Sequence, residues 1–281
     1  MTRLFTFGCS FTEYKWPTWA DILGREFDYF ENWGRTGAGN SFIFNSLIEC
    51  AKRNNITKDD TVIIMWTSIA REDRWTSERG WITPGSIYNQ SEYDRNFVKT
   101  FADPIGYLIR DLATISGTKQ ILESLGCQWQ FLSMVPLNYY NDSVDEFDNQ
   151  LIINKNVLEL YKDDLLAIKP SVYEVVFNND WYSRPVPSTE SETEYNILKG
   201  NDWPSWQDFN ANILTNISDK IKTEIKEKFF KKNIRMDTHP TPQEHLLYLD
   251  ALNFAISAST RKWIKEYNNP NWKTTKPRIR F

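Results

Sequence analysis

The segment Val62-Ile63-Ile64-Met65-Trp66 contains no polar side chain. A strand with one face in solvent alternates apolar and polar residues, whereas a continuous apolar run is typical of a strand buried on both faces of a parallel sheet. Parallel strands are joined by crossovers that are usually helical, so helices are expected to cover that sheet. This segment therefore predicts an α/β protein with a parallel sheet.

The rest of the chain alternates strand-like and helix-like segments, as this prediction requires. Strands are expected at residues 2–8, near 27–30, at 61–66 and at 128–135. Helices are expected at residues 17–26, 41–52, 104–125 and near 154–168. In open α/β sheets ligands bind where strands end, so residues that directly follow the strands are the candidates for a functional site.

One such residue is Ser10, in a small-residue turn after the first strand-like run. A hydroxyl is a poor nucleophile at neutral pH and needs an adjacent base and an accessible setting. Gly8 allows the chain to bend there and lets a ligand approach the backbone. The residues from Ser10 to Glu13 also fit a capping box, in which Ser10 starts a helix. Both interpretations hold together, because the amino terminus of a helix offers donors to an oxyanion.

The candidates for a base are few, because the chain has only two histidines, His239 and His245. Pro240 disfavours helical geometry at His239, which is therefore expected in a loop before a helix. Thr241 and Glu244 predict a capping box at the start of that helix. Its apolar face is expected to contain Leu246, Leu249, Leu252 and Ile256. His239 is the candidate base, Asp237 the carboxylate that could orient its ring, and His245 is expected to be structural.

These segments resemble conserved blocks of the SGNH (GDSL-type) hydrolases. Gly8-Cys9-Ser10-Phe11-Thr12 is similar to the block with the nucleophilic serine, and Asn32-Trp33-Gly34-Arg35-Thr36-Gly37 to the block whose last glycine donates an N–H to the oxyanion hole. Asp237 and His239 resemble the fifth block, with one residue fewer between them than is usual. The resemblance implies a three-layer α/β/α, flavodoxin-like sheet and a serine esterase, with Ser10 as nucleophile, His239 as base, Asp237 as orienter and Gly37 as oxyanion donor.

The third block differs from the family pattern. The family has Gly-x-Asn-Asp after the central strand, whereas this chain has Thr67-Ser68-Ile69-Ala70-Arg71. Ser68, Thr67 or Arg71 could supply the missing oxyanion donor, and Arg71 could also bind an anionic group of the substrate. Alternatively, these residues only close a strand and form surface salt bridges. Two functions stay open: an ester hydrolase, and a non-catalytic binding or structural protein resembling the hydrolase-like proteins of bacteriophages, where such a domain can be part of a particle.

Composition excludes several other classes. A net charge of −4 and a pI near 5.4 argue against a general nucleic-acid binder. The three cysteines, an odd number, do not imply a disulfide framework, and Cys9 is expected to pack rather than react. No Walker lysine, dinucleotide spacing or metal-ligand spacing is present, so neither cofactor nor metal is expected. Without a signal-like or membrane-spanning segment, the protein is expected to be soluble, and cytoplasmic or virion-associated.

The sequence predicts one domain over residues 1–267, with insertions at about 72–98 and 138–206 and a basic arm at 268–281. The insertions are rich in aromatic residues, which either pack these loops onto the body or stack on sugar rings. An O-acetylated carbohydrate or glycoconjugate is therefore the preferred substrate, ahead of a lipid or a simple ester. From Arg261 onward the chain holds seven basic residues against one acid. This end is expected to be a solvated arm or to mediate a homo-oligomer or assembly.

Overall fold

The computed structural model describes residues 2–69, 71–88, 92–137, 149–179, 239–267 and 272–274. The chain divides into two compact units: Met1–Val176 together with Pro240–Phe281, and Phe177–His239. All helices and strands described below lie in the first unit. Asp237, the segment 180–238 and most of the predicted arm lie outside the described residues, so predictions that fall there stay predictions.

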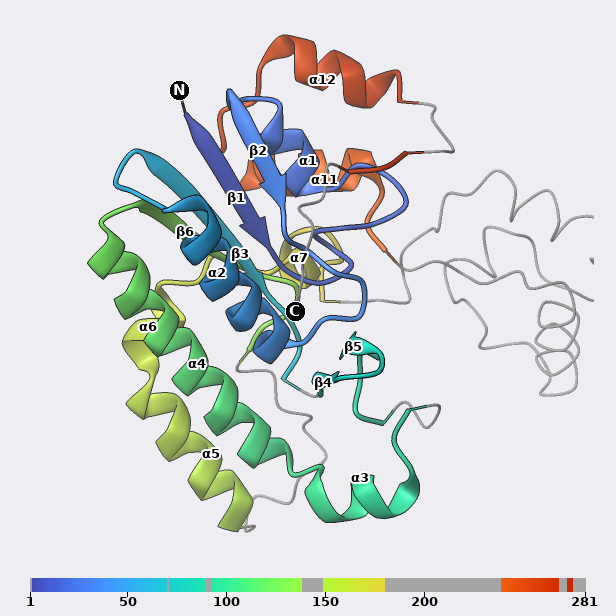
Figure 1. Ribbon diagram of the computed structural model, residues 1–281, viewed down its shortest axis with the longest axis vertical. Helices are drawn as coiled ribbons and strands as arrows, with labels where there is room; N and C mark the ends of the chain where they lie inside the picture. Colours follow the sequence, from blue (N-terminus) through green and yellow to red (C-terminus); the bar gives the residue numbers. More distant parts are fainter. Residues whose placement is uncertain are drawn as a thin grey trace, which may run out of the picture. The chain divides into compact units, whose positions relative to one another are not determined.

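A parallel four-stranded sheet forms the centre of the first unit (Figure 1). Its strands are β1 (Arg3–Phe7), β2 (Tyr29–Asn32), β3 (Asp60–Trp66) and β6 (Gln128–Ser133), in the order β2-β1-β3-β6. In the register of the sheet, Leu4 pairs with Phe30 on one side and with Thr61 on the other. This order, in which the second strand precedes the first and the third follows it, is that of flavodoxin-like doubly wound sheets. The predicted α/β class with a parallel sheet is confirmed.

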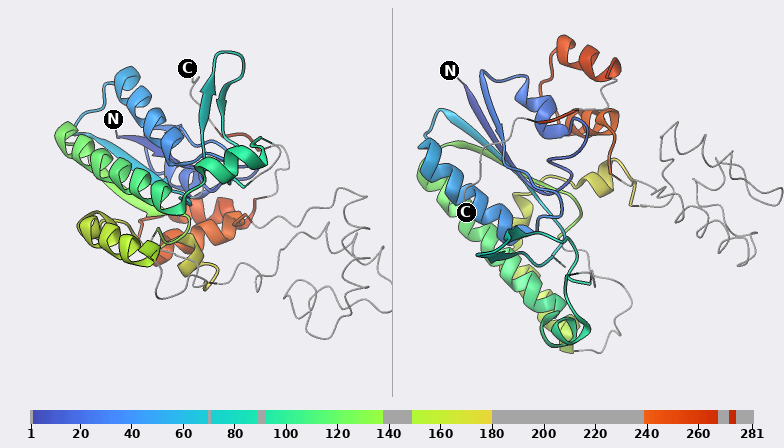
Figure 2. Two further views of the ribbon diagram at one scale, coloured as in Figure 1. Left: turned by 90° about the horizontal axis from the view of Figure 1, so that it is seen from below. Right: turned by 45° about the vertical axis from the view of Figure 1, so that its right-hand side comes forward.

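Both faces of the sheet are buried. Side chains from alternate positions of the strands, such as Phe5, Ile64 and Phe131, pack in one apolar core with helices α2 (Asn40–Asn54) and α4 (Pro104–Leu125). The intervening residues point to the other face and are also buried; they include Leu4, Ile63, Met65 and Leu132. Helices α1 (Trp19–Gly24) and α11 (Pro242–Ala251) lie on that side (Figure 2). The fully apolar third strand is explained by this double burial.

The shorter elements complete the unit. Strands β4 (Arg74–Thr76) and β5 (Gly80–Ile82) form an antiparallel hairpin, and helix α3 (Arg95–Phe101) follows it. Helices α5 (Asn149–Leu160), α6 (Lys162–Leu166) and α7 (Val172–Val175) come after β6, and α12 (Ala258–Lys265) comes after α11. The predicted insertion at 72–98 thus contains a hairpin. None of the described helices is long and apolar enough to span a membrane.

Several local predictions need correction. The helix expected near 154–168 is two helices, α5 and α6. No helix starts at Ser10: the N–H groups of Thr12 and Glu13 donate to the Cys9 carbonyl at 2.9 and 3.1 Å and close a single turn that does not continue as a helix. Strand β2 begins at Tyr29, two residues later than expected, since the turns after α1 continue to Phe27. Helix α11 ends at Ala251, so Leu252 and Ile256, both expected on its apolar face, lie beyond it.

The described part of the carboxyl-terminal segment packs on the body. The Trp272 ring lies 5.4 Å from that of Trp263 on α12, between ring centroids, and the Thr274 hydroxyl donates to Asp21 on α1. Arg261 makes two hydrogen bonds to the Asp250 carboxylate, at 2.5 and 2.8 Å. Part of the basic end is therefore bound to its own chain.

Candidate active site

Four loops leave the carboxyl ends of the parallel strands at one edge of the sheet. They follow β1 with Gly8, β2 with Trp33, β3 with Thr67 and β6 with Met134. Parallel strands all end at the same edge, which is where ligands bind in folds of this class. The candidate residues Ser10, Gly37, Ser68 and their neighbours belong to three of these loops.

The sulfur atom of Met134 joins these loops. It lies 3.6 Å from Cys9 Sγ after β1, 3.6 Å from Thr67 Oγ1 after β3, and 3.6 Å from an Arg71 guanidinium nitrogen. Met134 is itself fixed by a backbone hydrogen bond of 2.8 Å from its N–H to the Trp66 carbonyl. Ser10 and Ser68 each directly follow a residue that contacts Met134. The structure therefore brings the loop of Ser10 and the loop of Ser68 together.

Ser10 lies in a tight turn and is 5% exposed. The turn requires glycine at position 8, because a Cβ there would lie 2.0 Å from Thr12 Oγ1 and 3.1 Å from the Met65 carbonyl oxygen. The preceding Cys9 is fully buried with its thiol against Met134. This is the packing role expected for Cys9.

Gly37 lies in the loop after β2, which contacts the Ser10 loop on one side and the β4–β5 hairpin on the other. On the first side the Arg35 N–H donates to the Gly8 carbonyl at 3.0 Å, and the Thr36 N–H donates to Glu13 Oε2 at 3.3 Å. On the second side a Cβ on Gly37 would lie 2.0 Å from the Thr83 carbonyl oxygen. Gly37 also has φ +78°, in the left-handed region. Glycine is therefore needed here for both conformation and space.

Thr67, one of the candidate donors, is fully buried, and its backbone is already bonded. Its N–H donates to Asn40 Oδ1 at 2.9 Å, and its carbonyl accepts from Asn40 Nδ2 at 3.1 Å. The next residue, Ser68, is partly exposed. Asn40 is the first residue of helix α2. Its side chain reaches the loop after β3, which the local pattern around Asn40 could not indicate.

Arg71 connects two loops of the site. Its Nη1 donates to the Ala38 carbonyl at 2.8 Å, and its own carbonyl accepts from Arg110 Nη2 at 2.9 Å. Arg71 is thus anchored in the fold rather than confined to surface salt bridges. Because Ala38 directly follows Gly37, the Arg71 side chain holds the Gly37 loop against the loop after β3.

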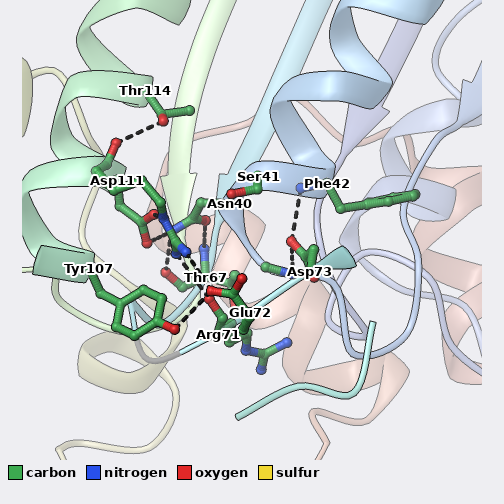
Figure 3. Close-up of polar contacts among 12 residues, drawn as sticks. Asn40, Ser41, Phe42, Thr67, Arg71, Glu72, Asp73, Tyr107, Asp111 and Thr114 are labelled. Carbon is green, nitrogen blue, oxygen red and sulfur yellow. Dashed lines mark hydrogen bonds and ion pairs between the residues drawn. The ribbon is translucent and has the colours of Figure 1, made fainter. Parts of the chain in front are cut away.

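A buried polar cluster lies behind these loops (Figure 3). Glu72 accepts from the Tyr107 hydroxyl at 2.8 Å and pairs with Arg110 at 3.2 Å. Burial raises the pKa of Asp111 to about 6, although hydrogen bonds from Arg110 and Asn40 oppose the shift. Burial also raises the pKa of Asp73, which accepts the N–H groups of Gly39 and Phe42 and so caps helix α2. Sequence reasoning missed this cluster, because its partners are about 30 to 70 residues apart.

The histidine candidates differ in their position. His245 lies on α11, is 1% exposed, and has its ring edge-on to Phe11 at 6.5 Å between centroids, as a structural residue would. His239 falls in the second unit, while Pro240, the next residue, falls in the first. The Pro240 carbonyl accepts a 2.7 Å hydrogen bond from Trp16 Nε1, in the segment that follows Ser10. The first unit therefore brings together Ser10, Gly37, Thr67, Ser68 and Arg71, and does not include His239.

Among the residues that the structure describes, no three His, Cys, Asp or Glu side chains gather in a way that could hold a metal ion. The polar groups that the candidate residues contribute to the site are hydroxyl, backbone amide and guanidinium groups. These groups suit the binding of a carbonyl oxygen or an anion through hydrogen bonds.

The sheet order defines a doubly wound α/β protein. No protein-family model matches the chain, and no curated protein matches it either. Among solved structures, the chain is similar to the "Crystal structure of a member of the lipolytic protein G-D-S-L family from Veillonella parvula DSM 2008". The TM-score is 0.37 and the sequence identity 16%, over 68% of this chain and 88% of that one. The α/β class of this chain rests on its own strand pairing.

Proposed function

We propose that the protein is a serine ester hydrolase. The observation that carries this proposal is the gathering of Cys9, Thr67 and Arg71 around Met134, because it joins the Ser10 loop to the loop of Ser68 at the ligand-binding edge of the sheet. A nucleophilic hydroxyl beside several hydrogen-bond donors is the arrangement that acyl transfer needs.

In the proposed mechanism Ser10 Oγ attacks the acyl carbonyl of an ester. His239 accepts the Ser10 proton and returns it to the leaving alcohol, with Asp237 orienting the ring. The N–H groups of Ser10 and Gly37, together with Ser68, stabilise the oxyanion. Water then attacks the acyl-enzyme with His239 as base, which releases the carboxylic acid and restores Ser10. Arg71 holds the Gly37 loop in place and could pair with an anionic group of the substrate.

The role proposed for His239 follows from the resemblance of Asp237 and His239 to the fifth block of the family. The next residue in the chain, Pro240, accepts a hydrogen bond from Trp16. The Trp16 bond thus ties the residue after His239 to the segment that follows Ser10. Asp237 precedes His239 by two residues in the chain.

The preferred substrate class is an O-acetylated carbohydrate. Trp75 and Tyr88, in the segment after β3, are each 51% exposed, and this segment contacts Gly37 through Thr83. Exposed rings of this kind can stack on sugar rings. Replacement of Trp75 by Ala should raise KM for an acetylated oligosaccharide and leave KM for p-nitrophenyl acetate unchanged. An equal effect on both substrates would contradict a carbohydrate-specific role.

Turnover of p-nitrophenyl acetate and labelling by a fluorophosphonate test the activity. Wild-type protein should turn over the ester and be labelled at Ser10, and Ser10→Ala should abolish both. Cys9→Ala is the matched control, because it removes the neighbouring thiol; labelling should persist, at a rate lowered by the lost contact with Met134. Loss of labelling in Cys9→Ala with retention in Ser10→Ala would assign the nucleophile to the thiol instead.

A non-catalytic binding or structural protein is the second candidate, favoured by the 5% exposure of Ser10. At this exposure only a small part of Ser10 is open to an ester from solvent. Folded wild-type protein that is neither labelled nor active, and that forms a stable assembly, would support this second candidate.

A further inference from the structure

Asn40 binds both backbone groups of one residue in the loop after β3. Its Oδ1 accepts the Thr67 N–H at 2.9 Å, and its Nδ2 donates to the Thr67 carbonyl at 3.1 Å (Figure 3). Both residues are fully buried. Backbone groups buried away from water need partners, and at Thr67, just beyond the end of β3, the Asn40 amide supplies them.

Asp111 fixes the orientation of the Asn40 amide. The Asn40 Nδ2 donates to Asp111 Oδ2 at 2.7 Å, and an ionised carboxylate can only accept, so the amide cannot turn over without losing this bond. Arg110 Nε donates to the other carboxylate oxygen at 2.7 Å and balances its charge. Arg110 also donates to the Arg71 carbonyl at 2.9 Å. The loop after β3 is therefore held at two points: Thr67 binds Asn40 of helix α2, and Arg71 binds Arg110 of helix α4.

The bond to the Thr67 carbonyl has a consequence for Ser68. The Thr67 carbonyl and the Ser68 N–H belong to one planar trans peptide and point in opposite directions. By holding the carbonyl, Asn40 Nδ2 sets the direction of the Ser68 N–H, which points away from Asn40. A side chain from helix α2 thus sets the direction of a backbone N–H in the loop after β3.

We propose that Asn40, oriented by Asp111, is a positioning residue that directs the Ser68 N–H toward the oxyanion. This inference rests on the proposed esterase function and adds to it a residue that does not touch the substrate. A purely structural Asn40 would affect folding alone. A positioning Asn40 affects the transition state more than the binding of the ester, so kcat falls while KM stays nearly constant.

Exchanging the side chains at positions 40 and 111 separates a purely structural role of Asn40 from a positioning role. Asn40→Asp keeps an acceptor for the Thr67 N–H, loses the donor to the Thr67 carbonyl and repels Asp111. In the double variant Asn40→Asp/Asp111→Asn, the new amide at position 111 can donate to the carboxylate at 40, so the bond between helices α2 and α4 returns. The donor to the Thr67 carbonyl does not return. Thermal stability should therefore recover in part in the double variant, because the Thr67 carbonyl still lacks its donor, and kcat should stay low.

The measurements are kcat and KM for p-nitrophenyl acetate, thermal unfolding, and hydrogen exchange of peptides that cover residues 67–71. Asn40→Asp should lower kcat on the order of a hundredfold, as expected for a misdirected oxyanion donor, and speed exchange in that segment. The control is Thr118→Val on α4, which removes another buried hydrogen bond, of 2.7 Å to Thr114, and should lower stability without changing kcat. If Asn40→Asp does not fold, Asp111→Asn alone should lower kcat several-fold with an unchanged KM.

Recovery of kcat together with stability in the double variant would overturn the inference, and so would wild-type kcat in folded Asn40→Asp. Measurements on the wild-type protein test the proposed function separately. Wild type without turnover or Ser10 labelling would refute the esterase and this catalytic role together. An active wild type with an unaffected Asn40→Asp would refute only the role of Asn40.

Discussion

The Cys9 thiol lies 3.6 Å from the Met134 thioether, although the two residues are 125 positions apart in the chain. This contact joins the loop after β1 to the loop after β6, and Met134 also contacts the hydroxyl of Thr67. A thioether is flexible and polarisable, so it can contact a thiol, a hydroxyl and a guanidinium at once. The geometry of the candidate site thus depends on one buried side chain, whose thioether contacts Cys9, Thr67 and Arg71.

Shortening Met134 should therefore disturb both stability and the site. Met134→Ala is expected to lower the free energy of unfolding by about 2–5 kcal/mol, because it leaves a cavity among three loops. Met134→Leu keeps the volume and should lower it by less than about 1.5 kcal/mol. Urea unfolding at pH 7 measures both, and ester turnover should fall more in the Ala variant. Equal losses in the two variants would show that volume at position 134 is not what holds the loops.

Gly37 should not tolerate a side chain. An alanine there would adopt φ +78° and put its Cβ 2.0 Å from the Thr83 carbonyl oxygen, so we expect a loss of on the order of 3 kcal/mol or more. Gly80 is a matched control, with φ +66° and no atom within 4 Å of an added Cβ. Gly80→Ala should lose only about 1–2 kcal/mol. Ester turnover should fall strongly in Gly37→Ala alone, and similar losses of stability in both variants would contradict the close contact with Thr83.

Asp21 makes stability depend on pH. Burial raises its pKa to about 6, against hydrogen bonds from Thr18 and Thr274. The folded protein therefore binds the Asp21 proton more tightly than the unfolded chain does, whose pKa is near 3.8. This contribution to stability is complete below about pH 4, is lost as the pH rises to about 6, and amounts to on the order of 3 kcal/mol.

Replacement of Asp21 by Asn should remove this dependence. Relative to wild type, Asp21→Asn should become more stable as the pH rises from 4 to 7, in urea unfolding at several pH values. Asp111 shifts in the same direction, so only the difference between the two proteins isolates Asp21. Asp28→Asn is the control, because the pKa of that exposed carboxyl is lowered by hydrogen bonds from Thr2. Stability curves of wild type and Asp21→Asn that run parallel from pH 4 to 7 would refute the assignment.

Elements with signals at both of their ends could be predicted from the sequence. Helix α4 runs from Pro104 to Leu125 as expected, because Asp103 caps its amino terminus and Gly126 ends it with φ +69°. The capping box of Thr241 and Glu244 is likewise confirmed. These signals act within a few residues, where local sequence determines the conformation.

The sequence could not predict contacts that depend on how distant segments come together. Asn40 resembles an ordinary residue in a helix start, and its partners Thr67 and Asp111 are 27 and 71 positions away. The turn at Ser10 fits a capping box locally. The chain instead turns back toward the end of β2, where Asn32 donates to the Thr12 carbonyl at 2.7 Å. Tertiary hydrogen bonds determine the contacts of Asn40 and hold the Ser10 turn against the end of β2, and no local pattern encodes these bonds.

The hydrogen bond from Trp16 Nε1 to the Pro240 carbonyl gives a test for the candidate base. Trp16→Phe retains an aromatic ring beside Tyr14 and removes only the donor. If this bond positions the chain next to His239, kcat for ester hydrolysis should fall several-fold. The free energy of unfolding should fall by only about 1 kcal/mol. Tyr248→Phe is the matched control, because it removes an aromatic donor to another proline carbonyl, that of Pro170, at 2.8 Å. It should cost similar stability and leave kcat unchanged. Equal effects of the two variants on kcat would mean that the Trp16 bond acts through general stability, and that His239 does not depend on it.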